Sequence, residues 1–139
     1  MRNTAAAQGW SLRIVMEPEP GQNVTPPARP VVRVTDGVPE GTALLALAGE
    51  LDLASADVVR SAIEEARGSG ARRVVLDLTD VEFVDSSMLK ELLRANAELP
   101  ESGSALVLAA PQAPVQRLLE LTRTSELFTV AADRAAACA

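Results

Sequence analysis

The spacing of apolar positions changes several times between residue 31 and the C-terminus. Residues 43–48 and 105–109 are continuous apolar runs, which is typical of strands buried on both faces of a sheet. Residues 72–78 predict another buried strand, and residues 31–34 predict an edge strand. A last short strand is expected at residues 127–130.

Between these strands, the apolar residues recur at helical spacing. A first helix is expected to have Ser55 as its N-cap and to stop at Gly68, because Ser favours helix starts and Gly favours helix ends. A second helix is expected from Ser86 to about residue 97. A third has Pro114 near its first turn, where the missing N–H costs nothing. The residues expected on the inner faces of the first and third helices include Val58, Val59, Ile63, Val115, Leu119 and Thr122.

Strands that alternate with helices of this length indicate βαβ units and a largely parallel sheet. We therefore expect one α/β domain over residues 31–139, ending in one or two helical turns at residues 131–137. Residues 1–30 differ, because they contain five prolines, which block helices and central strands. We expect a flexible arm there. A tail without a role, a partner-binding arm and an edge strand at residues 10–16 all stay open.

The composition disfavours several kinds of chemistry. The 139-residue chain has no His, the usual general base and metal ligand, and its single cysteine, Cys138, cannot form an internal disulfide. A net charge of −6, with scattered Arg and one Lys, argues against direct contact with nucleic acid. No apolar run is long enough for a membrane span, and no signal peptide is recognised. We therefore expect a cytoplasmic protein that is not an enzyme and uses no cofactor or metal.

The most informative segment joins the strand at 72–78 to the second helix through a short acidic turn. It ends in Asp85, Ser86 and Ser87, where a helix exposes unpaired N–H groups and the positive end of its dipole. Helix capping accounts for one such residue. A phosphate would be well tolerated at the same place, so a phosphoacceptor or contact site stays open beside capping. A serine hydrolase is disfavoured, because the glycines and the His of that motif are missing.

Another acidic residue, Asp52, follows the strand at 43–48. The carboxyl ends of parallel strands meet at one edge of a sheet, so Asp52 and Asp85 are expected on the same rim, on either side of Ser86. Two carboxylates there could position the serine for a kinase or hold Mg²⁺ that a partner brings with ATP. No glycine-rich phosphate loop is present, so any nucleotide would belong to the partner.

Four short motifs stand in a defined order, at residues 49–52, 75–87, 114–119 and 125–128. Their sequences and spacing resemble the STAS domain of bacterial anti-sigma factor antagonists over roughly residues 31–135. The resemblance implies a mixed, mostly parallel sheet with helices mainly on one face. It also implies a partner-switching role, with an anti-sigma factor of the protein-kinase type and a phosphatase as partners.

The resemblance also assigns residues to this role. It makes Ser86 the phosphorylated residue and places Asp52, Asp85 and Ser87 in the partner-binding surface around it. The chain departs from the family where glycine is usual, because it carries Met88 and Lys90. Glycine lets another backbone approach closely, so the departure bears on which partner docks. Met88 is expected to act as an adaptable contact residue for that partner.

Two functions follow from the resemblance. In the first, the unphosphorylated protein binds an anti-sigma factor kinase and releases the sigma factor, and phosphorylation of Ser86 ends this binding. In the second, the chain is a non-switching STAS adaptor subunit of a lipid-transport ATPase or of a stress-signalling scaffold, and Ser86 is a cap or contact. A homodimer through the edge strand at residues 31–34 also stays open.

Overall fold

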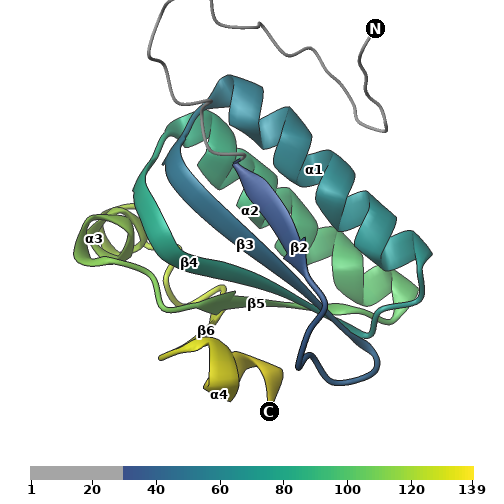
Figure 1. Cartoon of the computed structure of the whole chain (residues 1–139). Helices are drawn as coiled ribbons and strands as arrows, with labels where there is room; N and C mark the ends of the chain where they lie inside the picture. The colour runs from purple at the N-terminus through teal and green to yellow at the C-terminus, as the bar shows by residue number, and fades with distance from the viewer. Residues whose placement is uncertain (1–29) are drawn as a thin grey trace, which may run out of the picture.

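A five-stranded sheet organises residues 30–139, the part of the chain that this computed structural model describes (Figure 1). The strands are β2 (Val31–Val34), β3 (Thr42–Leu51), β4 (Arg73–Val84), β5 (Ala105–Ala109) and β6 (Thr129–Ala131). They lie in this order across the sheet. β2 runs antiparallel to β3, and the other neighbours are parallel. The predicted α/β class and mostly parallel sheet are confirmed.

Helices cover both faces of the sheet unequally. They are α1 (Leu53–Gly68), α2 (Ser86–Glu98), α3 (Ala113–Leu121) and α4 (Arg134–Cys138), with a short 3-10 turn, η1 (Leu99–Ser102), after α2. Buried residues of α1, α2 and α3 belong to one large core, whereas α4 contributes to a smaller core. Figure 1 shows α1 and α2 side by side across one face and α4 at the other. The helices therefore lie mainly on one face, as expected.

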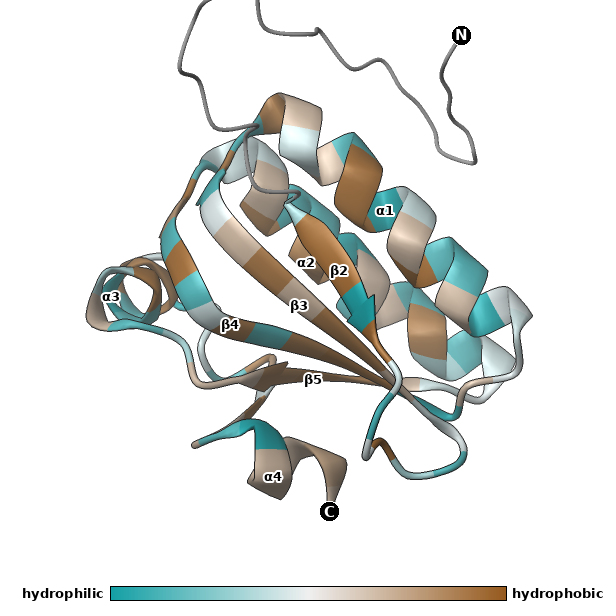
Figure 2. Cartoon of the chain, in the orientation of Figure 1, coloured by the Kyte–Doolittle hydropathy of each residue, from teal (hydrophilic) through white to brown (hydrophobic). Residues whose placement is uncertain are grey.

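Successive residues of the central strands face these two cores. In β4, Val74 and Leu76 belong to the large core, and Val75 between them belongs to the smaller one with Leu44 and Ala137. The apolar colouring runs almost unbroken along β3 and β5 for this reason (Figure 2). The continuous apolar runs in the sequence thus reflect strands that are covered on both sides.

The small C-terminal helix is fixed to its face of the sheet by polar contacts. Arg134, the first residue of α4, places Nη2 2.8 Å from Oδ2 of the buried Asp77 on β4. Arg73 donates from Nη1 to the carbonyl oxygen of Ala137 over 3.0 Å. Because α4 is only five residues long, it depends on these contacts rather than on its own helical stability.

Several boundaries differ from the sequence predictions. β4 continues to Val84, so the expected acidic turn is part of the strand. Asp52 rather than Ser55 is the N-cap of α1, although the helix ends at Gly68 as predicted. The side chains of Val58 and Thr122 are exposed rather than packed inside.

The last two elements lie slightly later than expected, because residues 127 and 128 form a turn before β6 and residues 132 and 133 separate it from α4. Apart from residue 30, the expected arm at residues 1–30 and its strand at 10–16 lie outside the described residues.

Candidate functional site

The carboxyl ends of β3 and β4 lie side by side and lead directly into α1 and α2. Leu51 is paired with Val84, and the backbone N–H of Asp85 donates to the carbonyl oxygen of Leu51 over 3.0 Å. Asp52 alone connects β3 to α1, and Asp85 alone connects β4 to α2. Both acidic residues therefore lie at one edge of the sheet, as the strand pattern predicts. We call this edge, with Asp52, Asp85 and Ser86, the rim.

Each rim aspartate caps the helix that follows it. Oδ1 of Asp52 accepts hydrogen bonds from the backbone N–H and the hydroxyl of Ser55, both at 3.1 Å. Oδ1 of Asp85 accepts from the backbone N–H of Met88 at 2.9 Å. The bond from the Ser55 N–H, followed by the bond from its hydroxyl, lowers the pKa of Asp52, so this carboxylate is negative at neutral pH. Capping thus accounts for the two aspartates.

Capping does not account for the serines. Ser86 is the first residue of α2 and is exposed, and Ser87 is half-buried. Within residues 30–139 neither hydroxyl has a hydrogen-bond partner, since Asp85 already supplies the side-chain cap. The Ser86 hydroxyl is therefore accessible at the positive end of a helix, next to two carboxylates.

Exposed apolar side chains accompany the rim. Leu53, directly after Asp52, is 67% exposed, and Phe83, near the end of β4, is 54% exposed. Scattered exposed apolar residues are ordinary, but aromatic side chains are enriched in protein interfaces. The rim thus combines apolar contact area with an accessible hydroxyl.

Met88 does not belong to this surface. Its side chain is fully buried and forms part of the large core under α2. The expectation that Met88 contacts a partner is therefore wrong in this structure, because the helix turns position 88 toward the sheet. Lys90, the other departure from the family, is exposed.

Ion pairs tie together the two helices that begin at the rim. Arg94 of α2 places Nη1 2.6 Å from Oε1 of Glu98 and 3.3 Å from Oε2 of Glu64 on α1. It also pairs with the buried Glu91, which raises the pKa of Arg94. Glu91 in turn lies 3.1 Å from Nε of Arg60 on α1. This network holds α1 and α2 in register, and so it fixes the spacing of their starts.

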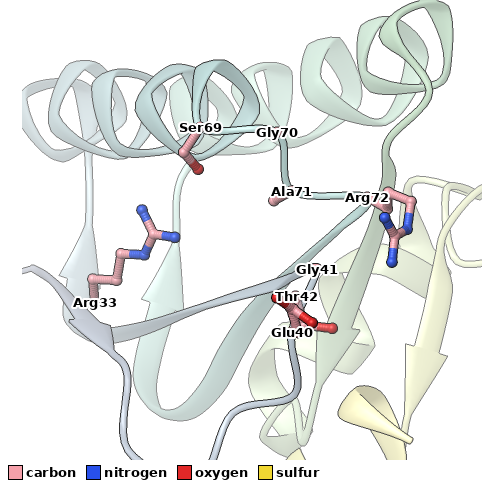
Figure 3. Close-up of a pocket in the computed structure, with 8 residues that line it drawn as sticks. All are labelled: Arg33, Glu40, Gly41, Thr42, Ser69, Gly70, Ala71 and Arg72. Atoms are coloured by element: carbon pink, nitrogen blue, oxygen red, sulfur yellow. The ribbon is translucent and has the colours of Figure 1, made fainter.

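A shallow polar pocket lies at the opposite edge of the sheet, where β3 and β4 begin and α1 ends. Its volume is about 320 Å³, and Arg33, Glu40, Ser69 and Arg72 are among the side chains that line it (Figure 3). It shares no residue with the rim. Residues 30–139 contain no group of three or more His, Cys, Asp or Glu side chains placed to hold a metal ion. None of the helices in this range is long and apolar enough to cross a membrane.

The sheet order and the helix arrangement define a small α/β domain, and comparison with known families identifies its family. The model of the STAS domain matches residues 29–137. The chain belongs to the STAS domain family, which confirms the resemblance seen in the sequence.

Two relatives in sequence indicate which STAS domain proteins this chain is similar to. The anti-sigma-F factor antagonist RsfB of Mycobacterium tuberculosis is 31% identical over 105 residues, covering 73% of this chain and 85% of RsfB. The anti-sigma F factor antagonist of Paenibacillus polymyxa is 31% identical over 91 residues, covering 65% of this chain and 78% of that protein.

Solved structures agree on the fold. The unphosphorylated form of the anti-sigma factor antagonist SpoIIAA superposes with a TM-score of 0.62 at 21% identity, covering 76% of this chain and 91% of SpoIIAA. The phosphorylated form of SpoIIAA, a Bacillus cell fate determinant, gives 0.59 at 20% identity, covering 76% and 95%. The chain is thus a STAS domain protein whose named relatives are anti-sigma factor antagonists.

Proposed function

We propose that this protein is an anti-sigma factor antagonist that works by partner switching. Unphosphorylated, it binds an anti-sigma factor of the protein-kinase type through the rim and so releases the sigma factor. Phosphorylation of Ser86 ends the binding, and a phosphatase restores it. The observation that carries the proposal is the exposed hydroxyl of Ser86 at the start of α2, which serves neither as a cap nor as a hydrogen-bond donor within residues 30–139.

Electrostatics explain how one modification would act. Phosphorylation adds a charge of about −1.5 to −2 at neutral pH. The new charge lies beside Asp52 and Asp85, so the rim becomes strongly negative and costly to desolvate against a partner. The helix N-terminus stabilises the phosphate locally, and so the domain itself stays folded. A coupling of roughly 1–3 kcal/mol, about 5- to 150-fold in affinity, would be enough for a useful switch.

The surroundings of Ser86 also suit docking. Leu53 and Phe83 supply apolar contact area at the same edge of the sheet. Asp52, Asp85 and Ser87 supply polar contacts around it. In this proposal the chain is the substrate of its kinase partner and not itself an enzyme. It acts in the cytoplasm, without direct contact to nucleic acid.

A second candidate is a non-switching STAS adaptor subunit of a lipid-transport ATPase or a stress-signalling scaffold. One observation favours it. Lys90 is exposed near the start of α2, where the resemblance to the family predicts glycine, so it gives a docking partner a bulkier surface there. In this reading the rim binds constitutively, and Ser86 is only a contact.

Co-purification from native cells separates the two candidates. Tagged wild type is compared with Ser86→Ala, Ser86→Asp and Ser102→Asp, and the captured proteins are identified by mass spectrometry. Ser102 is the matched control, because it is an exposed serine in η1, at the opposite edge of the sheet. We expect wild type, Ser86→Ala and Ser102→Asp to capture a kinase-type anti-sigma factor. Ser86→Asp should capture at least tenfold less of this protein than wild type does.

Capture of the same kinase by Ser86→Asp at wild-type level would refute the switch. Capture of a transporter or scaffold component by all four proteins would refute the first candidate and support the adaptor.

A further inference from the structure

Lys90 stands in an unusual position relative to the rim. It lies four positions after Ser86 on α2, and both side chains are exposed. Side chains at this spacing are neighbours on the same face of a helix. Lys90 is also the single lysine of the chain.

No acidic side chain within residues 30–139 forms an ion pair with Lys90. The two acidic residues nearest to it in the sequence are already engaged. Asp85 accepts from the N–H of Met88, and Glu91 is bound by Arg60 and Arg94. Four arginines in this range have acidic side chains as partners, namely Arg60, Arg67, Arg94 and Arg134, whereas the other five, like Lys90, have none. Lys90 is therefore a cation without a counter-charge in the described part of the chain.

Most charged groups that β3, β4 and α1 place near the start of α2 are negative. They are Glu50, Asp52, Asp57, Glu82 and Asp85. Lys90 precedes every other cation in α2, and the first cation in α1 is Arg60, which is bound to Glu91. On these four elements, Lys90 is therefore the cation best placed to meet a phosphate on Ser86.

We propose that Lys90 is the built-in counter-charge for a phosphoserine at position 86. Its ammonium group pairs with the phosphate across one turn of α2 and stabilises the phosphorylated form of this protein. The inference rests on the proposed function, since it concerns the regulation of the same serine.

The order of the two groups suits the pair. An acid placed four positions before a lysine stabilises a helix more than the reverse order, because the negative charge then lies nearer the positive, N-terminal end of the helix dipole. The phosphate occupies the first helical residue, where the dipole adds to the attraction. Lys90 also offsets the repulsion from Asp52 and Asp85 that the new charge creates.

The test uses the full-length chain with phosphoserine placed at position 86 during translation, so no kinase is needed. Phosphorus NMR then follows the second ionisation of the phosphate in wild type, Lys90→Gln and Lys90→Arg. A nearby cation favours the dianion, so its removal should raise the titration midpoint in Lys90→Gln by about 0.3 pH unit or more. Lys90→Arg should titrate like wild type. The difference should shrink in 1 M salt, where charges are screened.

Arg72→Gln is the matched control, because Arg72 is an exposed cation at the opposite edge of the sheet with no ion pair within residues 30–139. This variant should not move the midpoint. Equal midpoints in wild type and Lys90→Gln at low salt would overturn the inference, and so would an equal change in Arg72→Gln. Either result leaves the proposed function standing, because co-purification with Ser86→Asp tests that separately.

Discussion

Met88 and Lys90 lie two positions apart in α2, yet the structure gives them opposite surroundings. Met88 is fully buried in the large core, and Lys90 points to solvent. Both stand where the resemblance to the family predicts glycine, and their opposite surroundings give the two departures different physical consequences. Met88 adds packing between α2 and the sheet, and Lys90 adds a positive charge on the exposed face of α2.

This difference predicts unequal costs for restoring glycine. Met88→Gly removes a buried side chain and adds the backbone freedom of glycine, so it should lower the free energy of unfolding by about 3 kcal/mol or more. Lys90→Gly removes only an exposed side chain from a helix and should cost about 1 kcal/mol. Urea denaturation monitored by far-UV circular dichroism measures both. Equal losses would show that Met88 is not the core residue described here.

The rim shows what residue patterns can and cannot predict. The meeting of Asp52 and Asp85 follows from parallel strands alone, and so it was predictable. The choice of N-cap was harder to predict, since Asp52 and Ser55 are both residues that favour this position. In the structure Asp52 is the cap and accepts hydrogen bonds from Ser55. The burial of Met88 depends on how α2 is rotated as it leaves β4. The sequence pattern does not determine this rotation, because residues 86 and 87 are both polar.

At the scale of elements, α4 depends on the pair between Asp77 and Arg134. Burial opposes ionisation of Asp77, but the hydroxyl and N–H of Thr79, together with the Arg134 guanidinium, outweigh it and hold the pKa of Asp77 below its usual range. The carboxylate is therefore ionised in the folded protein at neutral pH and stabilises it there.

The depressed pKa sets the direction of a pH dependence. Stability from Asp77 is fully present above the pKa of an unfolded aspartate, about 3.9, and is lost as the pH falls through the lower pKa of the folded state. Arg134→Met leaves the carboxylate without its cation and should cost about 1–3 kcal/mol at pH 7. The gap between the variant and wild type should narrow below about pH 4. Urea denaturation at several pH values measures this, and a gap independent of pH would contradict it.

The sequence pattern underestimates the length of β4. Its second half is exposed except at Val81 and Val84, a spacing of three rather than the two expected of a strand. Shifts in its register with β3 produce this spacing, one of them between Ala46 and Ala48. Extra residues in one strand of a pair break the alternation on which strand prediction depends. Acidic residues at exposed positions then resemble a turn.

At the scale of the whole molecule, the fold was predictable because its core is aliphatic and layered. Long apolar runs identify the strands, and helical spacing identifies what covers them. The large core and the ion pairs between α1 and α2 lie behind the rim, so a charge placed on Ser86 has little effect on either.

Ser86→Asp should therefore leave the free energy of unfolding within about 0.5 kcal/mol of wild type. The new carboxylate gains from the helix N-terminus and loses to Asp52 and Asp85, and these effects partly cancel. Urea denaturation of both proteins, with two-dimensional NMR spectra, measures this. Widespread spectral change or a large loss of stability would mean that lost binding in this variant reflects unfolding rather than a switch.

The single-residue connections at the rim have a consequence for the speed of recognition. Asp52 and Asp85 are each the whole link between a strand and a helix, so within residues 30–139 neither of these two connections contains a loop that could open, close or reorder. A surface of this kind meets its partner as a rigid body. Association of the unphosphorylated protein should then be limited by diffusion and orientation, with a rate that changes with ionic strength and shows no slow conformational phase.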